Sequence, residues 1–218
     1  MRLSWERHAM PYVPEHKAKT RIRILDTARR LFNRNGLTAI SIDEVMAGAG
    51  LTRGGFYSYF DSKEELFAEA IAHFINGGPN AGWQRMAFAD RPEGRALARA
   101  ILDAYLSRDH LDDVEGSCPV VGLATDVARS SAPVKRAYRQ VMEMMAEIFA
   151  SNLGPNAVAV ADGAALSDER QRALAVVALC VGGMVLARAA DDEPAADELR
   201  AASRRYALAL AGLESTGE

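Results

Sequence analysis

The chain has 218 residues, 49% of them hydrophobic, which allows one large domain or two small ones with a buried core. Its net charge is −3, and its two cysteines, Cys118 and Cys180, form no C-x-x-C pair or Cys/His cluster, which argues against a disulfide framework or a metal site. The N-terminus has no secretory-signal pattern, and the apolar run 173–187 is shorter than the roughly 20 residues that span a bilayer. We therefore expect a cytoplasmic protein with no membrane partner.

Positive charge gathers at the N-terminal end of the sequence. Residues 1–63 contain 11 Lys/Arg against 6 Asp/Glu, a net of +5, so the remainder carries −8. Because phosphate is attracted by local charge, this basic third is the candidate for binding nucleic acid in spite of the acidic total. Residues 1–18 are expected to form a flexible arm ahead of it, with or without a role in binding.

Apolar residues recur at helical spacing along the whole chain, and no segment alternates as a strand would, so the predicted fold class is all-α. The first helix is predicted over 19–35, with Gly36 ending it in a left-handed conformation. The outer face of this helix is expected to carry Arg21, Arg23, Arg29 and Arg30.

A short second helix is predicted directly after the first. Ser41 and Glu44 have the spacing of a capping box, in which a hydroxyl and a carboxylate satisfy free amides at a helix start. The apolar positions that follow continue for about two turns, up to Gly50. Leu51 is placed to fill the space beneath the turn.

A third short helix is predicted from the candidate N-cap Thr52 to about Tyr59. Phe56 and Phe60 are expected to face inward. The polar and aromatic side chains expected on the outside are Arg53, Tyr57, Ser58 and Tyr59. Two short helices joined by a tight turn, the second with such an exposed face, are typical of a helix-turn-helix that places its second helix in the major groove of DNA.

A second capping box at 62–65 predicts a longer helix that ends at 77–79, where Gly-Gly-Pro marks a domain boundary. Beyond it, 156–163 is expected to be a surface connection. Further helices are predicted over 83–88, 94–108, 120–130, 133–153, 168–190 and 195–213.

The run 28–66, above all Thr-Arg-Gly-Gly-Phe-Tyr-Ser-Tyr-Phe-Asp-Ser-Lys-Glu-Glu-Leu at 52–66, resembles the signature of the TetR family of bacterial transcriptional regulators. The resemblance implies an N-terminal three-helix DNA-binding head over 19–63. It also implies a C-terminal helical domain for ligand binding and dimerisation over 64–218, whose first helix, 64–76, connects the two. The expected partners are double-stranded operator DNA, a second copy of the chain and a small-molecule effector.

The resemblance also assigns roles within the helix-turn-helix. Small residues at positions 52, 54 and 55 would allow close approach to DNA, and Ser41, Tyr57 and Lys63 would hold phosphates, whereas Tyr59 stands where many members have His. Independently, hydroxyls and amides at helix starts are natural phosphate ligands. Arg53 is a candidate for a guanine edge, with a solvated or phosphate-bound side chain as the alternative. The predicted DNA-binding set is Ser41, Thr52, Arg53, Gly54, Gly55, Tyr57, Ser58, Tyr59 and Lys63.

In the C-terminal part, the helix over 173–187 is apolar nearly all round, so it should be buried on two sides. Together with the last helix it suits a four-helix interface in a homodimer, and a monomeric core helix is the alternative. An apolar or aromatic effector would lie within the body, although such side chains at helical spacing are also typical of plain core. The predicted lining is Phe67, Trp83, Met86, Leu102, Tyr105, Leu106, Cys118, Met144, Met145 and Phe149.

The sequence therefore predicts a repressor that a small molecule releases from its operator. It contains no recognisable nucleophile elbow or phosphate-binding loop, so neither catalysis nor a cofactor is predicted. One alternative is a thiol-based sensor of electrophiles or oxidants, because Cys118 lies beside a predicted helix start where the dipole favours thiolate, although a buried inert cysteine is the simpler interpretation. Another is a helical enzyme or small-molecule-binding protein without DNA binding.

Overall fold

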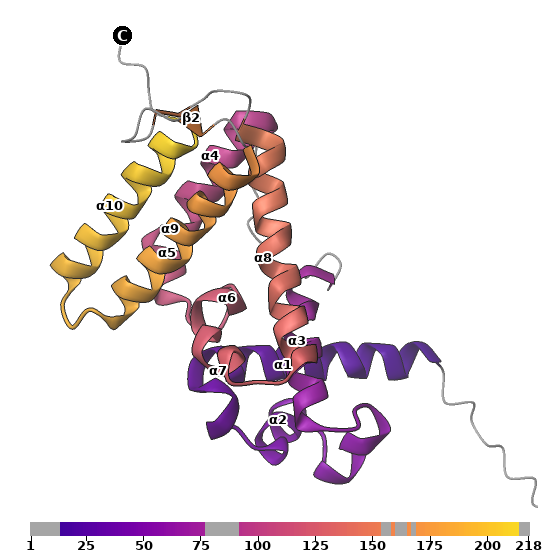
Figure 1. Cartoon of the computed structure of the whole chain (residues 1–218). Helices are drawn as coiled ribbons and strands as arrows, with labels where there is room; N and C mark the ends of the chain where they lie inside the picture. Colours follow the sequence, from indigo (N-terminus) through magenta and orange to yellow (C-terminus); the bar gives the residue numbers. More distant parts are fainter. Residues whose placement is uncertain (1–13, 77–91, 154–157, 160–164, 167–168, 214–218) are drawn as a thin grey trace, which may run out of the picture.

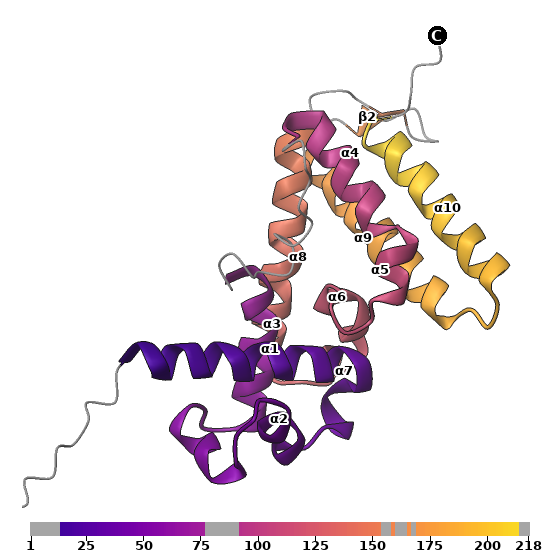
Figure 2. The same ribbon diagram turned by 180° about the vertical axis from the view of Figure 1, so that it is seen from behind.

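The computed structural model describes residues 14–76, 92–153, 158–159, 165–166 and 169–213. The regular secondary structure of these residues is helical except for β1 (Val158–Ala159), which pairs antiparallel with β2 (Ala165–Leu166). Figures 1 and 2 show a small lower group of helices joined to a larger upper group. The all-α prediction is confirmed, and the strand pair is a local feature of the connection before the penultimate helix.

The lower group, here called the head, contains α1 (Pro14–Ala39), α2 (Ile42–Gly48) and the 3₁₀ helix η1 (Arg53–Ser58). Helix α1 begins at Pro14 rather than at the predicted Lys19, and proline suits a first helical turn because it needs no amide partner there. Gly36 interrupts α1 with a φ of 77° and a ψ of 169°. The positive φ is as predicted, but this combination is accessible essentially to glycine alone and differs from a left-handed cap.

The head has its own tightly packed centre. Phe32, Val45 and Met46 are fully buried, and Phe56 and Phe60 of the η1 segment join them, as predicted. The capping box at the start of α2 is also confirmed: the Ser41 hydroxyl accepts from the Glu44 amide at 3.2 Å, and the Glu44 carboxylate accepts from the Ser41 amide at 2.7 Å. These local contacts fix the start of α2 at Ile42.

Helix α3 (Lys63–Asn76) leaves the head and packs against α8 (Ala132–Leu153) of the upper group, here called the body. The Ser62 hydroxyl caps α3, but the Glu65 carboxylate accepts from the Asp61 amide instead of completing the predicted box. The other body helices are α4 (Gly94–Tyr105), α5 (Arg108–Asp112), α6 (Pro119–Gly122), α7 (Ala124–Ala128), α9 (Glu169–Ala189) and α10 (Glu193–Leu210).

Two predicted body helices are broken in the structure. The helix expected over 94–108 ends at Tyr105, because Ser107 accepts a hydrogen bond from the His110 amide and so starts α5. The helix expected over 120–130 divides at Leu123 into α6 and α7. The predicted helix over 83–88 and most of the predicted N-terminal arm lie outside the described residues.

Candidate DNA-binding surface

The turn between α2 and η1 depends on one glycine. Gly50 has a φ of 69°, a conformation that residues with a Cβ rarely adopt. This allows the Leu51 amide to donate to the Met46 carbonyl at 2.8 Å, and the half-buried Leu51 side chain packs on the core beneath the turn, as predicted. The turn therefore holds η1 at a fixed angle to α2.

The η1 segment is a 3₁₀ helix rather than the predicted α-helix, and it ends at Ser58. Tyr59 follows as the C-cap residue, with a φ of −122°. Its side chain is half-buried against the core, so Tyr59 is less accessible than predicted. Thr52 occupies the N-cap position as predicted, but its side chain makes no capping hydrogen bond.

Tyr57 is the most prominent side chain of η1, with 64% of its surface exposed. Thr52, Gly54 and Ser58 are exposed around it. The two glycines meet no requirement of the fold, since neither has a positive φ, a Cβ at Gly54 would meet nothing within 4 Å, and one at Gly55 would meet only Met46 Cε at 3.8 Å. Small residues at these positions leave the backbone open to approach from outside the chain.

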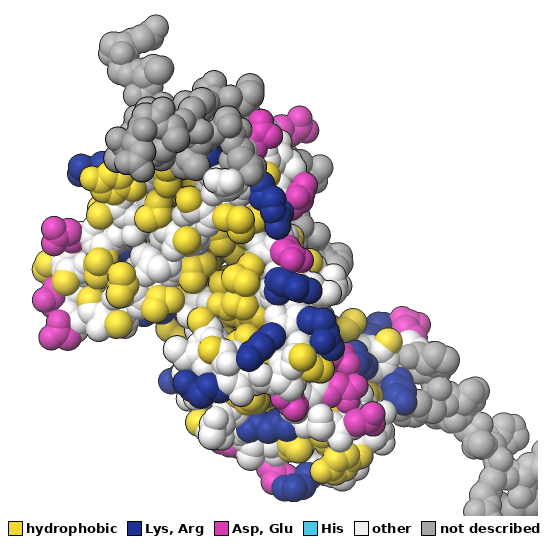
Figure 3. Space-filling model, viewed as in Figure 1, with side chains coloured by type: hydrophobic (Ala, Val, Ile, Leu, Met, Phe, Trp, Pro, Cys, Tyr) yellow, Lys and Arg dark blue, Asp and Glu magenta, His cyan; other side chains and the backbone are white. Residues whose placement is uncertain are grey.

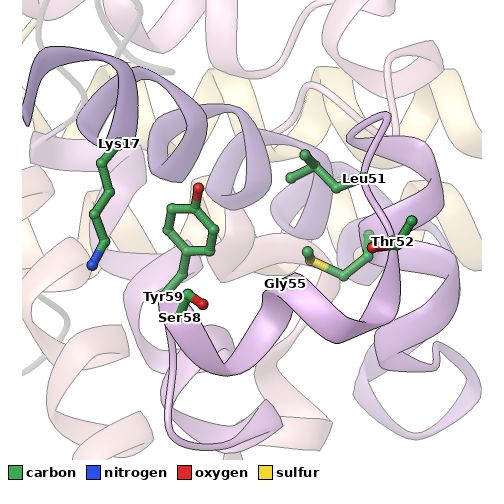
Figure 4. A pocket seen from close by; sticks show the side chains of 7 residues that line it. Lys17, Leu51, Thr52, Gly55, Ser58 and Tyr59 are labelled. Carbon is green, nitrogen blue, oxygen red and sulfur yellow. The ribbon is translucent and has the colours of Figure 1, made fainter. Parts of the chain in front are cut away.

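A groove of about 490 Å³ lies between η1, α2 and the first turns of α1 (Figure 4). Its apolar wall is formed by Met46, Leu51 and the Tyr59 ring. Lys17 stands at the other side, with Nζ 5.8 Å from the centre of that ring, a cation–π contact. The groove thus places a cation and the Thr52 and Ser58 hydroxyls next to the exposed face of η1.

Arg53, the first residue of η1, is held by a residue that the sequence did not single out. Its NH1 donates to Asp43 Oδ2 of α2 at 2.6 Å, and both side chains are more than half exposed. The guanidinium therefore has a defined position at the N-terminal end of η1, where a helix-turn-helix contacts base edges.

Lys63 is less accessible than the resemblance implies. Its Nζ donates to the Leu37 carbonyl at 2.5 Å, and partial burial lowers the pKa of the ammonium, which the nearby Glu44 carboxylate partly offsets. A phosphate contact by Lys63 would require the ammonium to share or leave this carbonyl.

Most cations of the head already have partners within the chain. Arg21 pairs with Glu69 and Lys19 with Glu15, and Arg30 and Arg34 both reach Glu115 of the body. The expected outward position of Arg29 is wrong, because this side chain is only 2% exposed. Most positive charges of residues 14–63, the described part of this region, are therefore paired with carboxylates of this chain. Hydroxyls, backbone amides and Tyr57 form more of the exposed surface of η1 than unpaired cations do.

Known families match both parts of the chain. The family described as "Bacterial regulatory proteins, tetR family" matches residues 24–70, and the "Tetracyclin repressor-like, C-terminal domain" matches residues 94–203. The chain belongs to the TetR family. It is a helix-turn-helix transcriptional regulator of the DNA-binding type, and the fold class predicted from the resemblance is confirmed.

Relatives and solved structures of the TetR family extend the match. The HTH-type transcriptional regulator YfiR of Bacillus subtilis is 30% identical over 145 residues, covering 62% of each chain, and the HTH-type transcriptional repressor KstR2 of Rhodococcus jostii is 26% identical over 152 residues, covering 70% of this chain and 71% of its own. The reduced form of Escherichia coli NemR superimposes with a TM-score of 0.66 at 20% identity, over 86% of this chain and 96% of that one. The Streptomyces coelicolor regulator SCO4454 gives 0.62 at 20% identity, over 90% and 97%.

In this TetR-family chain, much of the predicted effector lining gathers in the core of the body. Leu102 and Tyr105 of α4 and its C-cap residue Leu106 are buried. Cys118, Met145 and Phe149 are buried as well, and Met144 packs partly buried against this core. Phe67 is the exception, since its ring packs edge to face on Phe32 of α1 at 5.1 Å and so contributes to the head. Trp83 and Met86 lie outside the described residues.

The polar groups of this core are unusual. The Tyr105 hydroxyl is buried without a nitrogen or oxygen partner among the described residues. Its pKa is raised by burial and, after burial, by its interaction with the Cys118 thiol. Cys118 Sγ lies 4.0 Å from Met145 Sδ. Burial raises the pKa of Cys118 to about 11, because desolvation outweighs the hydrogen bond with the Val120 backbone at the start of α6, which lowers the pKa. Helix α6 has only four residues, too few to offset the desolvation of a charge.

One loop, residues 113–118, joins this core to the head, and no local sequence pattern predicts this junction. Asn33 Nδ2 donates to the Ser117 carbonyl at 2.8 Å, and Arg29 NH1 donates to the carbonyls of Glu115 and Ser117 at 3.2 and 3.4 Å. From the other side, Arg188 of α9 donates to the Ser117 hydroxyl at 3.2 Å. The loop is therefore in contact with α1, with α9 and with the Tyr105–Cys118 core at once.

The outer face of α9 and α10 is apolar. Figure 3 shows hydrophobic side chains gathered over these two helices. The large exposed ones are Leu174, Val185, Leu186 and Tyr206. By length and composition α9 could span a membrane, but core helices of soluble proteins pass the same test. Within one chain, 44% of the most apolar 18-residue stretch of α9 is buried, so more than half of that stretch is left uncovered.

Proposed function

We propose that the chain is a homodimeric repressor that binds a palindromic operator through the face of η1 and the start of α2. The observation that carries this proposal is the combination of exposed Tyr57 with Gly54 and Gly55, small residues that the fold itself does not require. Hydroxyls of Ser41, Thr52 and Ser58 and the amides near them would hold phosphates, and Arg53 would contact a base edge. The repressor role is supported by the similarity to KstR2, which is named a transcriptional repressor.

Dimerisation would bring two heads to successive major grooves. The exposed apolar residues of α9 and α10 form a continuous surface suited to a four-helix interface with a second copy. Two half-sites would then be spaced about one helical turn of DNA, or a multiple of it, from centre to centre. A partner copy would also cover the part of α9 that one chain leaves exposed.

The DNA-binding proposal is tested by selecting bound fragments from the genome of the source organism and titrating them at two salt concentrations. Wild-type protein should enrich a palindromic motif and lose affinity as salt rises, because phosphate contacts release counterions. Tyr57→Ala should weaken binding with little change in stability. Arg139→Ala, which alters an equally exposed side chain of α8 outside η1 and outside the apolar face of α9 and α10, is the control for loss of an exposed side chain. Salt-independent binding without an enriched sequence would rule the proposal out.

An effector would lie among the buried side chains around Tyr105. A largely apolar or aromatic molecule with one hydrogen-bonding group would suit this surface, since it would give the Tyr105 hydroxyl a nitrogen or oxygen partner. Its binding would shift the loop 113–118, and through Asn33 and Arg29 the orientation of the head. Such coupling must be reciprocal, so saturating operator DNA should weaken effector binding by the factor by which the effector weakens operator binding. An unchanged effector affinity would exclude it.

The thiol-sensor alternative gains no support from the Cys118 site. A thiol with a pKa of about 11 is almost wholly protonated at neutral pH and reacts slowly with oxidants. Cys118→Ser distinguishes the two mechanisms, because it would abolish a response to oxidants in a thiol sensor and would leave a ligand-released repressor able to respond to its effector.

A further inference from the structure

The exposed ion pair between Asp43 of α2 and Arg53 of η1 has little value for folding. Both side chains are more than half exposed, 54% for Asp43 and 61% for Arg53, and ion pairs exposed to this degree stabilise proteins weakly or not at all. Asp43 is also not needed to cap α2, since Ser41 and Glu44 already complete the capping box. Neither folding stability nor helix capping therefore explains why Asp43 is placed to accept a hydrogen bond of 2.6 Å from Arg53 NH1.

The pair lies where the proposed function needs specificity. Arg53 is the first residue of η1, and the N-terminal residues of a recognition helix are the ones that contact base edges. A carboxylate at this place is repelled by the DNA backbone. It is compatible with binding only if it faces the groove and remains paired with a cation.

Asp43 limits what the guanidinium can do. Only NH1 of Arg53 contacts the carboxylate, so the other N–H groups of the planar guanidinium remain able to donate to O6 and N7 of a guanine. An unanchored arginine of this length could instead turn to a phosphate, which carries no sequence information. Because Asp43 holds one edge of the guanidinium and repels phosphate, it favours the base contact over the backbone contact.

We infer that Asp43 is a specificity-determining residue of the operator contact, which positions Arg53 to recognise a G·C base pair. This role rests on the proposed function, in which the face of η1 binds operator DNA. In this arrangement Arg53 contacts the base and Asp43 contacts only Arg53, so Asp43 is a positioning residue. Its removal should lower discrimination between sequences without lowering affinity for DNA in general.

The test compares Asp43→Asn with Asp61→Asn, which removes the same charge from an exposed position of the head without touching Arg53. The probes are the motif enriched by the wild type, the same motif with each G·C pair changed in turn, and calf thymus DNA. Both variants should bind calf thymus DNA somewhat more tightly, because each loses one negative charge. Only Asp43→Asn should lose about 10-fold in discrimination at one G·C pair. Arg53→Ala should lose discrimination at the same pair, and the double variant should lose no more.

Each other result is decisive. If Asp43→Asn retains the discrimination of Asp61→Asn, or sharpens it, Asp43 does not position Arg53 and the inference is overturned while the proposed function stands. If the wild type enriches no sequence at all, the proposed function fails and the inference falls with it. Circular dichroism melting of both variants, expected to match the wild type, separates a binding effect from misfolding.

Discussion

The side-chain amide of Asn33 donates a hydrogen bond of 2.8 Å to the backbone carbonyl of Ser117, which joins helix α1 of the head to the loop leading into the body core. The same amide reaches the Glu115 carbonyl at 3.2 Å, so one buried side chain satisfies two carbonyls of a segment more than 80 positions away in sequence. Ser117 is followed by Cys118 of the body core, and its hydroxyl also accepts a hydrogen bond from Arg188 of α9. A displacement of the body core would therefore move the carbonyl to which α1 of the head is bonded.

Replacing Asn33 with alanine should lower the free energy of unfolding by about 1–3 kcal/mol, because two carbonyls of the loop lose a donor in a buried place. Asn35→Ala is the matched control, since the exposed Asn35 amide bonds only to the Leu31 carbonyl of its own helix. That variant should stay within about 0.5 kcal/mol of the wild type. Urea unfolding measures both, and equal losses in the two variants would show that the junction adds no stability.

Local signals in the sequence sufficed for much of the head. The Ser41 and Glu44 spacing located the start of α2, and Gly50, followed by Leu51, located the turn, because capping and turn chemistry depend on residues only a few positions apart. The inward positions of Phe56 and Phe60 followed from their spacing. The same logic overestimated the exposure of Tyr59, because the helix ends at Ser58 and the non-helical backbone of Tyr59 turns its side chain partly onto the core.

Contacts distant in sequence were beyond such reasoning. Arg29 follows Leu25 by four residues and precedes Phe32 by three, so its place on the buried stripe of α1 was visible, but charge alone suggested the surface. Only the fold brings the carbonyls of Glu115 and Ser117 to its guanidinium. The pairing of Asp43 with Arg53 likewise depends on the angle between α2 and η1, which no local pattern specifies.

Gly54→Ala should separate folding from DNA binding. A Cβ at Gly54 meets no atom within 4 Å and the backbone needs no positive φ, so stability should be unchanged or raised by up to about 1 kcal/mol. Operator affinity should fall, because the added methyl group would stand between the backbone and the DNA. Gly50→Ala provides the contrast: its φ of 69° predicts a loss of about 1–2 kcal/mol in stability. Unaltered DNA binding by Gly54→Ala would show that this face does not approach DNA closely.

The buried Cys118 thiol should be unreactive in the folded protein. Its pKa is raised from 9.0 to about 11 by desolvation, so the thiolate fraction at pH 8 is roughly 100-fold lower than for an ordinary thiol. Because the folded pKa lies above the unfolded one, the stability that this thiol contributes is complete below pH 9 and is lost as pH rises through 11. Alkylation of a Cys180→Ala variant with iodoacetamide, native and in urea, measures Cys118 alone. Rapid native modification at pH 8 would revive the thiol-sensor alternative.

The apolar face of α9 and α10 predicts a change of oligomeric state. Leu186 is 56% exposed in one chain, and Leu186→Glu would place a charge in the proposed four-helix interface. The variant should therefore sediment as a monomer at concentrations where the wild type is a dimer. Ile22→Glu is the control, because Ile22 is a similarly exposed aliphatic residue on α1 of the head, and it should leave the dimer intact. A dimeric Leu186→Glu protein would place the interface elsewhere.

Two tyrosines of the body, the half-buried Tyr138 and the buried Tyr105, should respond oppositely to loss of the hydroxyl. The Tyr138 hydroxyl donates to the Val120 carbonyl at 2.8 Å, so Tyr138→Phe should lower the free energy of unfolding by about 1 kcal/mol. The Tyr105 hydroxyl has no nitrogen or oxygen partner among the described residues, so Tyr105→Phe removes an unsatisfied group without removing ring packing and should be neutral or stabilising. Thermal unfolding of the two variants decides the matter. A Tyr105→Phe variant as destabilised as Tyr138→Phe would mean that the hydroxyl is already satisfied in the free protein, and it would then offer nothing to an effector.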